Sequence, residues 1–133
     1  MDSDPKPSAL MTSLGLDRII DAGASGRAIL QFRATMAMCH SGGIVQGGFV
    51  TGWLDSAMAH AVMASSNHEV SPLSLEIKVA FYASARPGLC IAEAWVDRRG
   101  KSTAFLEGVL KDEAGTILAK ATSTAKLVPI KRG

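Results

Sequence analysis

Residues 47–65 read GGFVTGWLDSAMAHAVMAS, a stretch without proline that contains four Ala, two Met and one Leu. These residue types favour helix, so the stretch predicts one long helix. When its residues are placed at about 100° intervals, apolar side chains cover well over half of the circumference. A helix with so much apolar surface is typical of the interior of a domain, so we expect it to be buried.

Asp55 is the only residue with a formal charge between Ala34 and His68, and it lies inside this predicted helix. A carboxylate in apolar surroundings costs free energy to ionise unless a partner compensates it. Two interpretations follow. Asp55 is either a structural residue, bonded to a buried backbone group or to a hydroxyl such as that of Thr51 or Ser56, or it takes part in catalysis.

Alternating apolar and polar residues predict strands on both sides of the helix. Short turns separate the later strands, so we expect successive antiparallel hairpins. Within residues 73–82, the odd-numbered Leu, Ile, Val and Phe side chains are expected to share one face. The predicted strands are residues 27–35, 73–82, 89–97, 102–111 and 117–127.

One buried helix and about five to six strands predict an α+β domain in which a curved antiparallel sheet wraps around the helix. Residues 1–12 are predicted to form a flexible tail, and residues 13–130 a single domain. The edge strand of such a sheet needs a cover, and a homodimer or a dimer-of-dimers tetramer supplies one.

The chain has 133 residues, of which 47% are apolar and 20% charged, and a net charge of +2. This charge is too small to indicate nucleic acid, and no apolar run reaches the roughly 18–20 residues that span a bilayer. The histidines are scattered and lack a carboxylate at ligand spacing, so no metal is predicted. Cys39 and Cys90 show no disulfide spacing, and without a signal peptide we expect a cytoplasmic protein.

Gly47 and Asp55 form the combination that suggests chemistry. They lie about 12 Å apart along one helix, so they cannot act on the same carbonyl group within one chain. In a two-fold dimer with antiparallel helices, the N-terminus of one helix would approach Asp55 of the other and offer its free N–H groups to an oxyanion. His40, in the loop before the helix, either contacts this carboxylate or substrate, or is an ordinary surface residue.

Basic residues gather at the ends of the predicted hairpins. Arg86, Arg98, Arg99 and Lys101 either attract phosphate groups or are solvated loop residues.

The run QGGFVTGWLDSA, from Gln46 to Ala57, resembles the His-Gly-Gly-x6-Asp-x-Ala signature of hotdog-fold acyl-CoA thioesterases. The subgroup that it resembles is the PaaI type of the phenylacetate pathway. The likeness implies a hotdog thioesterase domain, with Asp55 as the catalytic carboxylate and the Gly47 N–H of the opposite subunit binding the thioester oxygen. It continues in residues 74–81, 99–102 and 112–119.

The chain departs from the family pattern at two positions. Gln46 replaces the usual histidine before the two glycines, and His40 stands where the family often has Asn or Gln. Gln46 can form hydrogen bonds but cannot carry a proton, whereas His40 can carry one. We therefore predict His40 as a third catalytic residue, and no cofactor. The predicted substrate-binding residues are Gln46, Gly48, Thr51, Arg99 and Lys101.

The resemblance predicts hydrolysis of an acyl-CoA, or a related acyl thioester, to the free acid and CoA. Asp55 would act as base or nucleophile while Gly47 polarises the carbonyl group across a dimer interface. A non-catalytic module that binds or senses acyl-CoA on the same fold is the alternative. A dehydratase relative is a third candidate, but it would need an Asp/His pair within one short stretch, which the predicted helix does not provide.

Overall fold

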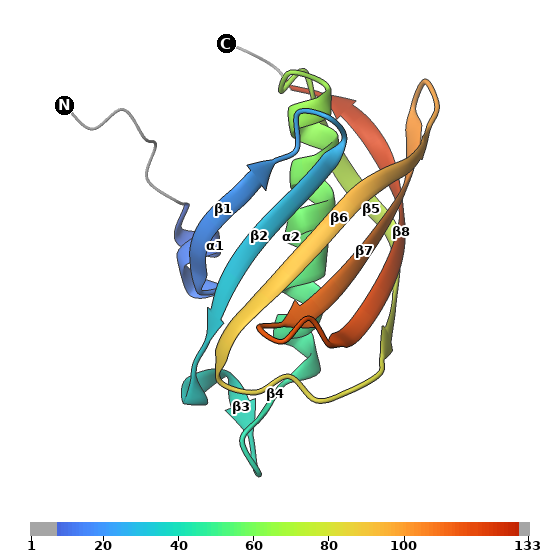
Figure 1. Cartoon of the computed structure of the whole chain (residues 1–133). Coiled ribbons are helices and arrows are strands. Elements are labelled where there is room, and N and C mark those ends of the chain that lie inside the picture. Colours follow the sequence, from blue (N-terminus) through green and yellow to red (C-terminus); the bar gives the residue numbers. More distant parts are fainter. Residues whose placement is uncertain (1–7, 131–133) are drawn as a thin grey trace, which may run out of the picture.

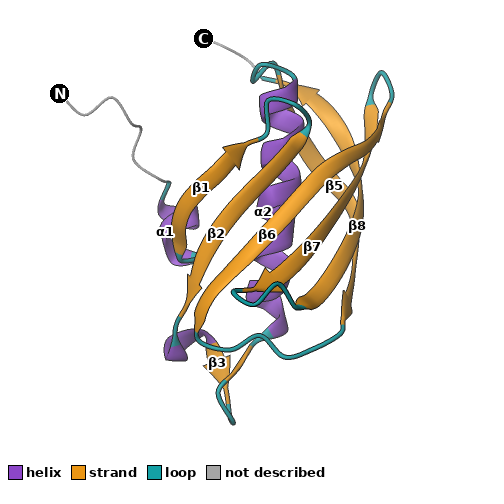
Figure 2. Ribbon diagram, viewed as in Figure 1, coloured by secondary structure: helices purple, strands orange, loops and turns teal. Residues whose placement is uncertain are grey.

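A six-stranded antiparallel sheet curves around one long helix, α2 (Gly47–Ser65), in the computed structural model of the chain (Figure 1). The structure describes residues 8–130. Figure 2 shows α2 behind the sheet, with no helix on the face turned toward the viewer. The strands of the sheet are β1 (Leu16–Ala22), β2 (Arg27–Ala34), β5 (Val70–Phe81), β6 (Gly88–Arg99), β7 (Thr103–Asp112) and β8 (Ile117–Pro129). The shorter elements are α1 (Ala9–Ser13), η1 (Met36–Met38), β3 (Cys39–His40) and β4 (Ile44–Val45). This is the predicted α+β architecture.

The strands follow the order β1-β2-β6-β7-β8-β5, and every neighbouring pair is antiparallel. The two hairpins predicted between residues 89 and 127 are confirmed as β6–β7 and β7–β8. The hairpin predicted between residues 73–82 and 89–97 is wrong, because β5 pairs with β8 whereas β6 pairs with β2. The crossing after β5 makes β5 an edge strand, and the opposite edge is β1, a strand that the alternation of residues did not predict.

The side of α2 that faces the sheet forms the centre of the core. Trp53 has no exposed surface, its indole N–H donates to the Leu14 carbonyl at 2.7 Å, and its ring stacks on Phe32 with centroids 5.6 Å apart. The other buried residues of α2 are Val50, Leu54, Ala57, Met58, Ala61 and Val62. The prediction of a buried helix is therefore confirmed only for the side of α2 that faces the sheet. Within residues 8–130, no helix is long and apolar enough to cross a membrane.

Helix α1 lies within the range predicted to be a tail except for its last residue, Ser13. The Ser8 side chain caps it by accepting a hydrogen bond from the Met11 N–H at 3.2 Å. Met11 and Leu14 then pack against the core. The described part of the predicted tail is thus a short helix in contact with the core, and residues 1–7 lie outside the described residues.

Strand β5 contains a β-bulge at Leu75, where its register against β8 shifts. Ser74 lies before the bulge and Ile77 after it, and both pair with buried residues of β8. Paired residues of antiparallel strands share a face, so Ser74 and Ile77 both face α2. The prediction of one face for the odd-numbered residues is therefore wrong before the bulge. Leu73 and Leu75 are instead 57% and 63% exposed.

Both cysteines are free thiols, in agreement with their spacing in the sequence. Burial raises the pKa of the Cys90 thiol to about 11, and the nearby Asp112 and Glu113 carboxylates add to the effect. Cys90 therefore stays protonated near neutral pH and is a poor nucleophile.

Candidate active site

The N-terminus of α2 presents backbone N–H groups without partners. Gln46 is the N-cap residue, and its side chain makes no capping hydrogen bond. Within residues 8–130, nothing accepts a hydrogen bond from the N–H of Gly47 or Gly48, whereas the Phe49 N–H donates to the Gln46 carbonyl. Free donors at a helix N-terminus favour negative charge, so this end of α2 can bind an oxyanion.

Phe81, the last residue of β5, lies directly against Gly47. A Cβ atom on residue 47 would sit 3.1 Å from the Phe81 Cζ atom and 3.4 Å from its Cε1 atom. On the other side, a Cβ atom on Gly48 would meet the Gln46 Oε1 atom at 3.1 Å. Both glycines therefore keep the helix end open between these two side chains.

A cavity of about 240 Å³ adjoins this helix end, and it brings together His40 and Gln46, the two departures from the family pattern. The His40 Nδ1 atom lies 3.1 Å from the Ser41 carbonyl oxygen. Because a carbonyl oxygen only accepts, Nδ1 carries the proton, and Nε2 of the neutral ring is left as an acceptor. The other residues of this cavity are Ala37, Met38, Cys39 and Phe49.

Asp55 lies on the side of α2 that the sheet leaves open, and it is exposed in the single chain. The prediction that it is buried is wrong for one chain, because its apolar neighbours in sequence point to the sheet and Asp55 points away. Its Oδ1 atom accepts a hydrogen bond from the Ser74 hydroxyl at 3.1 Å. The Thr51 hydroxyl, considered as a partner from the sequence, donates instead to the Gly47 carbonyl at 2.9 Å.

The basic residues do not form one cluster. Arg99 ends β6 and Lys101 lies in the β6–β7 hairpin, at the end of the fold opposite to β3 and β4 (Figure 1). Arg86 lies at the same end as β3 and β4, where its Nη1 atom donates to the Gly42 carbonyl at 3.3 Å. Within one chain, the predicted substrate-binding residues Arg99 and Lys101 are therefore remote from the N-terminus of α2.

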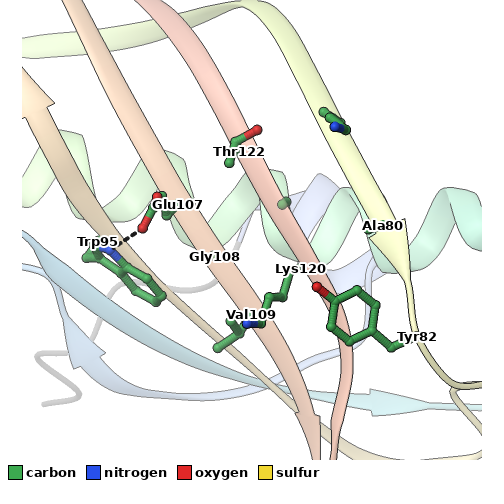
Figure 3. A pocket seen from close by; sticks show the side chains of 10 residues that line it. Ala80, Tyr82, Trp95, Glu107, Gly108, Val109, Lys120 and Thr122 are labelled. Atoms are coloured by element: carbon green, nitrogen blue, oxygen red, sulfur yellow. Dashed lines mark hydrogen bonds between the residues drawn. The ribbon is translucent and has the colours of Figure 1, made fainter.

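A second cavity, of about 340 Å³, lies on the outer face of the sheet, away from α2 (Figure 3). There the Trp95 indole N–H donates to Glu107 at 3.0 Å, and the Lys120 ammonium lies 5.8 Å from the centre of the Tyr82 ring. None of the predicted site residues lines this cavity. Within residues 8–130, no group of three or more His, Cys, Asp or Glu side chains is arranged to hold a metal ion.

The fold and this helix end match known proteins. Residues 42–119 match the family model of the thioesterase superfamily. The chain belongs to the thioesterase superfamily. A phenylacetic acid degradation-related protein from Ralstonia eutropha JMP134 has 30% sequence identity and a TM-score of 0.81, with 93% of each chain covered.

Two further structures share the fold. The PaaI protein of the E. coli phenylacetic acid degradation operon has 20% identity and a TM-score of 0.80, covering 93% of this thioesterase and 86% of PaaI. A conserved protein from Pseudomonas aeruginosa has 22% identity and a TM-score of 0.84, covering 92% and 95%. No protein in the curated set matches the sequence of this thioesterase. The predicted hotdog fold and PaaI-like subgroup are confirmed.

Sequence reasoning did not single out Ser74 or Phe81. The alternation in residues 73–82 places Ser74 on the face opposite to the odd-numbered apolar residues, and only the bulge at Leu75 turns it toward Asp55. The alternation predicts only that Phe81 shares a face with the other odd-numbered apolar residues of its strand. Its contact with Gly47 depends on how the end of β5 passes the N-terminus of α2, which no local pattern records.

Proposed function

We propose that this thioesterase hydrolyses acyl-CoA or a closely related acyl thioester in the cytoplasm. The observation that carries the proposal is the exposed Asp55 carboxylate, held by the Ser74 hydroxyl, on the same helix as the unpaired N–H of Gly47. A positioned carboxylate supplies a base or nucleophile, and a free N–H supplies an oxyanion site. These are the two groups that the hydrolysis of a thioester requires.

The active site is proposed to form between two chains. Gly47 and Asp55 are about 12 Å apart along α2, so one thioester cannot reach both in one chain. Strand β5 supports a dimer because it is an edge strand whose Leu73 and Leu75 side chains are mostly exposed. Antiparallel pairing of two β5 edges would bring the two α2 helices side by side in opposite directions. Each Asp55 would then approach the Gly47 of the partner, and pairs of dimers would give a tetramer.

The chemistry follows from these groups. The thioester oxygen accepts the Gly47 N–H, which polarises the carbonyl carbon. Asp55 of the partner either removes a proton from a water molecule that attacks this carbon or attacks it directly. The carbon–sulfur bond then breaks, CoA leaves as the thiolate and takes up a proton, and the acyl group ends as the free acid. In the direct route, water hydrolyses the acyl–Asp55 anhydride.

The neighbouring polar groups would hold the substrate. Gln46 and His40 share a cavity beside Gly47, and His40 offers its Nε2 atom to a water molecule or to the substrate. Thr51 and Gly48 lie within the first turns of the same helix. Arg99 and Lys101 could contact the phosphates of CoA only from the partner chain, because they lie at the far end of their own fold.

The direct experiment measures release of free CoA from a panel of acyl-CoA thioesters. The panel begins with phenylacetyl-CoA, because similar proteins are linked to phenylacetic acid degradation. We expect at least one thioester to be hydrolysed with saturation kinetics. Saturable binding of acyl-CoA without any thiol release would instead establish the non-catalytic binding module.

Replacing Ser74 with alanine is expected to lower kcat by about tenfold and to change KM little. The hydroxyl holds one carboxylate oxygen of Asp55, so its loss lets the carboxylate rotate away from the attacking water. Ser74→Thr keeps the hydroxyl and should restore most of kcat. Equal kcat values for the alanine variant and the wild type would remove Ser74 from the mechanism.

A further inference from the structure

The tip of the Phe81 ring points at the first residue of α2. Its Cζ, Cε1 and Cε2 atoms lie 3.1, 3.4 and 3.9 Å from the place of a Cβ atom on Gly47. The residue is 56% exposed and pairs with Ala119 of β8, a buried residue, so it stands on the α2 side of the sheet. A large apolar ring thus lies at the helix end without being part of the core.

The tip of the Phe81 ring lies next to the position that a Cβ atom of residue 47 would occupy. In a helix, the Cα–Cβ direction tilts toward the N-terminus, and the first N–H groups point toward the same end. A group placed where the Cβ would be is therefore next to any oxygen that accepts the Gly47 hydrogen bond. A thioester bound there must pass its carbonyl group along the edge of Phe81.

We propose that Phe81 is a specificity-determining residue that restricts the active site to acyl thioesters unbranched at the carbon next to the carbonyl group. The inference rests on the proposed function, because it takes Gly47 as the oxyanion site. A carbonyl oxygen that accepts this hydrogen bond lies about 2.9 Å from the Gly47 nitrogen, and the adjacent acyl carbon is two bonds from that oxygen. A methyl branch on this carbon would come within van der Waals distance of the ring tip, which closes the space beside Gly47.

The contact with Gly47 also explains why residue 47 cannot carry a side chain without movement of Phe81. Carbon atoms pack at about 3.5–4.0 Å, so a Cβ at 3.1 Å from Cζ forces the ring to give way. The same shortage of space that excludes a Cβ from residue 47 would exclude a branch on the substrate. The volume of the Phe81 ring, and not only its apolar character, therefore limits the space beside Gly47.

The test compares butyryl-CoA, which is unbranched, with isobutyryl-CoA, which carries the branch, on the wild type and on Phe81→Ala. We expect the wild type to prefer butyryl-CoA in kcat/KM by on the order of tenfold or more. In Phe81→Ala the preference should fall to about threefold or less, mainly because kcat/KM for isobutyryl-CoA rises. Phe105→Ala is the matched control, since Phe105 is similarly exposed, at 46%, but pairs with Thr124 on the outer face.

Three results are informative. A preference that collapses in Phe81→Ala and survives in Phe105→Ala supports the inference. A wild type that hydrolyses butyryl-CoA and keeps its preference in both variants overturns the inference and leaves the proposed function intact. A wild type that hydrolyses no thioester overturns both.

A second substitution, Phe81→Tyr, keeps the ring and needs no change of fold. Its hydroxyl would extend from Cζ into the space beside Gly47, so we expect kcat/KM to fall by on the order of tenfold for both thioesters. Phe105→Tyr should leave both values unchanged. Equal activity of Phe81→Tyr and the wild type would show that the ring tip does not border the bound thioester.

Discussion

Replacing Asp55 with asparagine is expected to lower kcat for thiol release by about a hundredfold or more, because a positioned acid or base typically contributes a factor of 10²–10⁴. The amide can still accept the Ser74 hydrogen bond, but it can neither take a proton from water nor attack the thioester. The side chain is exposed in the single chain, so the stability of each chain should change by less than about 0.5 kcal/mol. Thiol release from the best acyl-CoA of the panel, together with thermal unfolding, measures both effects.

Asp97→Asn is the matched control for this substitution. Asp97 is an exposed carboxylate near the end of β6, on a different element from Asp55. Its replacement should leave kcat unchanged. If Asp55→Asn retained wild-type turnover, Asp55 would be a structural residue that merely accepts the Ser74 hydroxyl, which is the other interpretation that the sequence left open.

The largest effect on stability is expected for Trp53→Ala, at about 3–5 kcal/mol. The residue is completely buried, so the substitution leaves a cavity between α2 and the sheet and removes the ring that stacks on Phe32. It also leaves the Leu14 carbonyl without its donor. Urea unfolding at one fixed protein concentration measures the change, because the apparent stability of an oligomer depends on concentration.

Two further variants separate the terms in this effect. Trp53→Phe keeps an aromatic ring on Phe32 but loses the indole donor, so it should cost about 1–3 kcal/mol, less than Trp53→Ala. Trp95→Ala removes a tryptophan from the outer face, where it is only partly buried and donates to Glu107. A loss of stability in Trp95→Ala as large as that in Trp53→Ala would contradict the placement of the core between α2 and the sheet.

The sequence predicts the central helix and the later hairpins because local patterns determine both. The residues from Gly47 to Ser65 combine a glycine-rich start with helix-favouring residues, and the observed bounds coincide with the prediction. The turns after β6 and β7 contain Gly100 and Gly115, and both turns lie between the strands that the alternation predicts. The pairing of β5 with β8 is different, because the choice of a distant partner strand depends on the whole sheet.

The candidate site is less predictable, because it depends on which face of a strand or helix each side chain occupies and not only on where the strands and helices lie. Alternation alone would place Ser74 on the face of β5 that points away from α2. The extra residue at Leu75 shifts the register, so that Ser74 faces α2 instead. The apolar residues around Asp55 in the sequence also overestimate its burial. Neighbouring residues of a helix point in different directions, so Asp55 can be exposed while Leu54 and Ala57 are buried. Gly47, Gln46 and His40 were predictable as neighbours because they surround one helix N-terminus.

Each active site is proposed to take Gly47 from one chain and Asp55 from the other. Gly47→Pro removes the N–H at the first helical position, where proline is favoured, and Gln46 already has the extended backbone that proline requires before it. Its Cβ would displace the exposed Phe81 ring by a few tenths of an ångström. Gly47→Pro and Asp55→Asn should each inactivate the proposed homodimer by a different route.

The decisive measurement is thiol release by the mixed dimer of these two variants, purified through two different affinity tags. If each site is shared between chains, one of the two sites of the mixed dimer combines an intact Gly47 with an intact Asp55. The mixed dimer should then recover about half of the wild-type kcat. If each site is built within one chain, every site carries one defect. A mixed dimer as inactive as the two parent variants would therefore contradict the account.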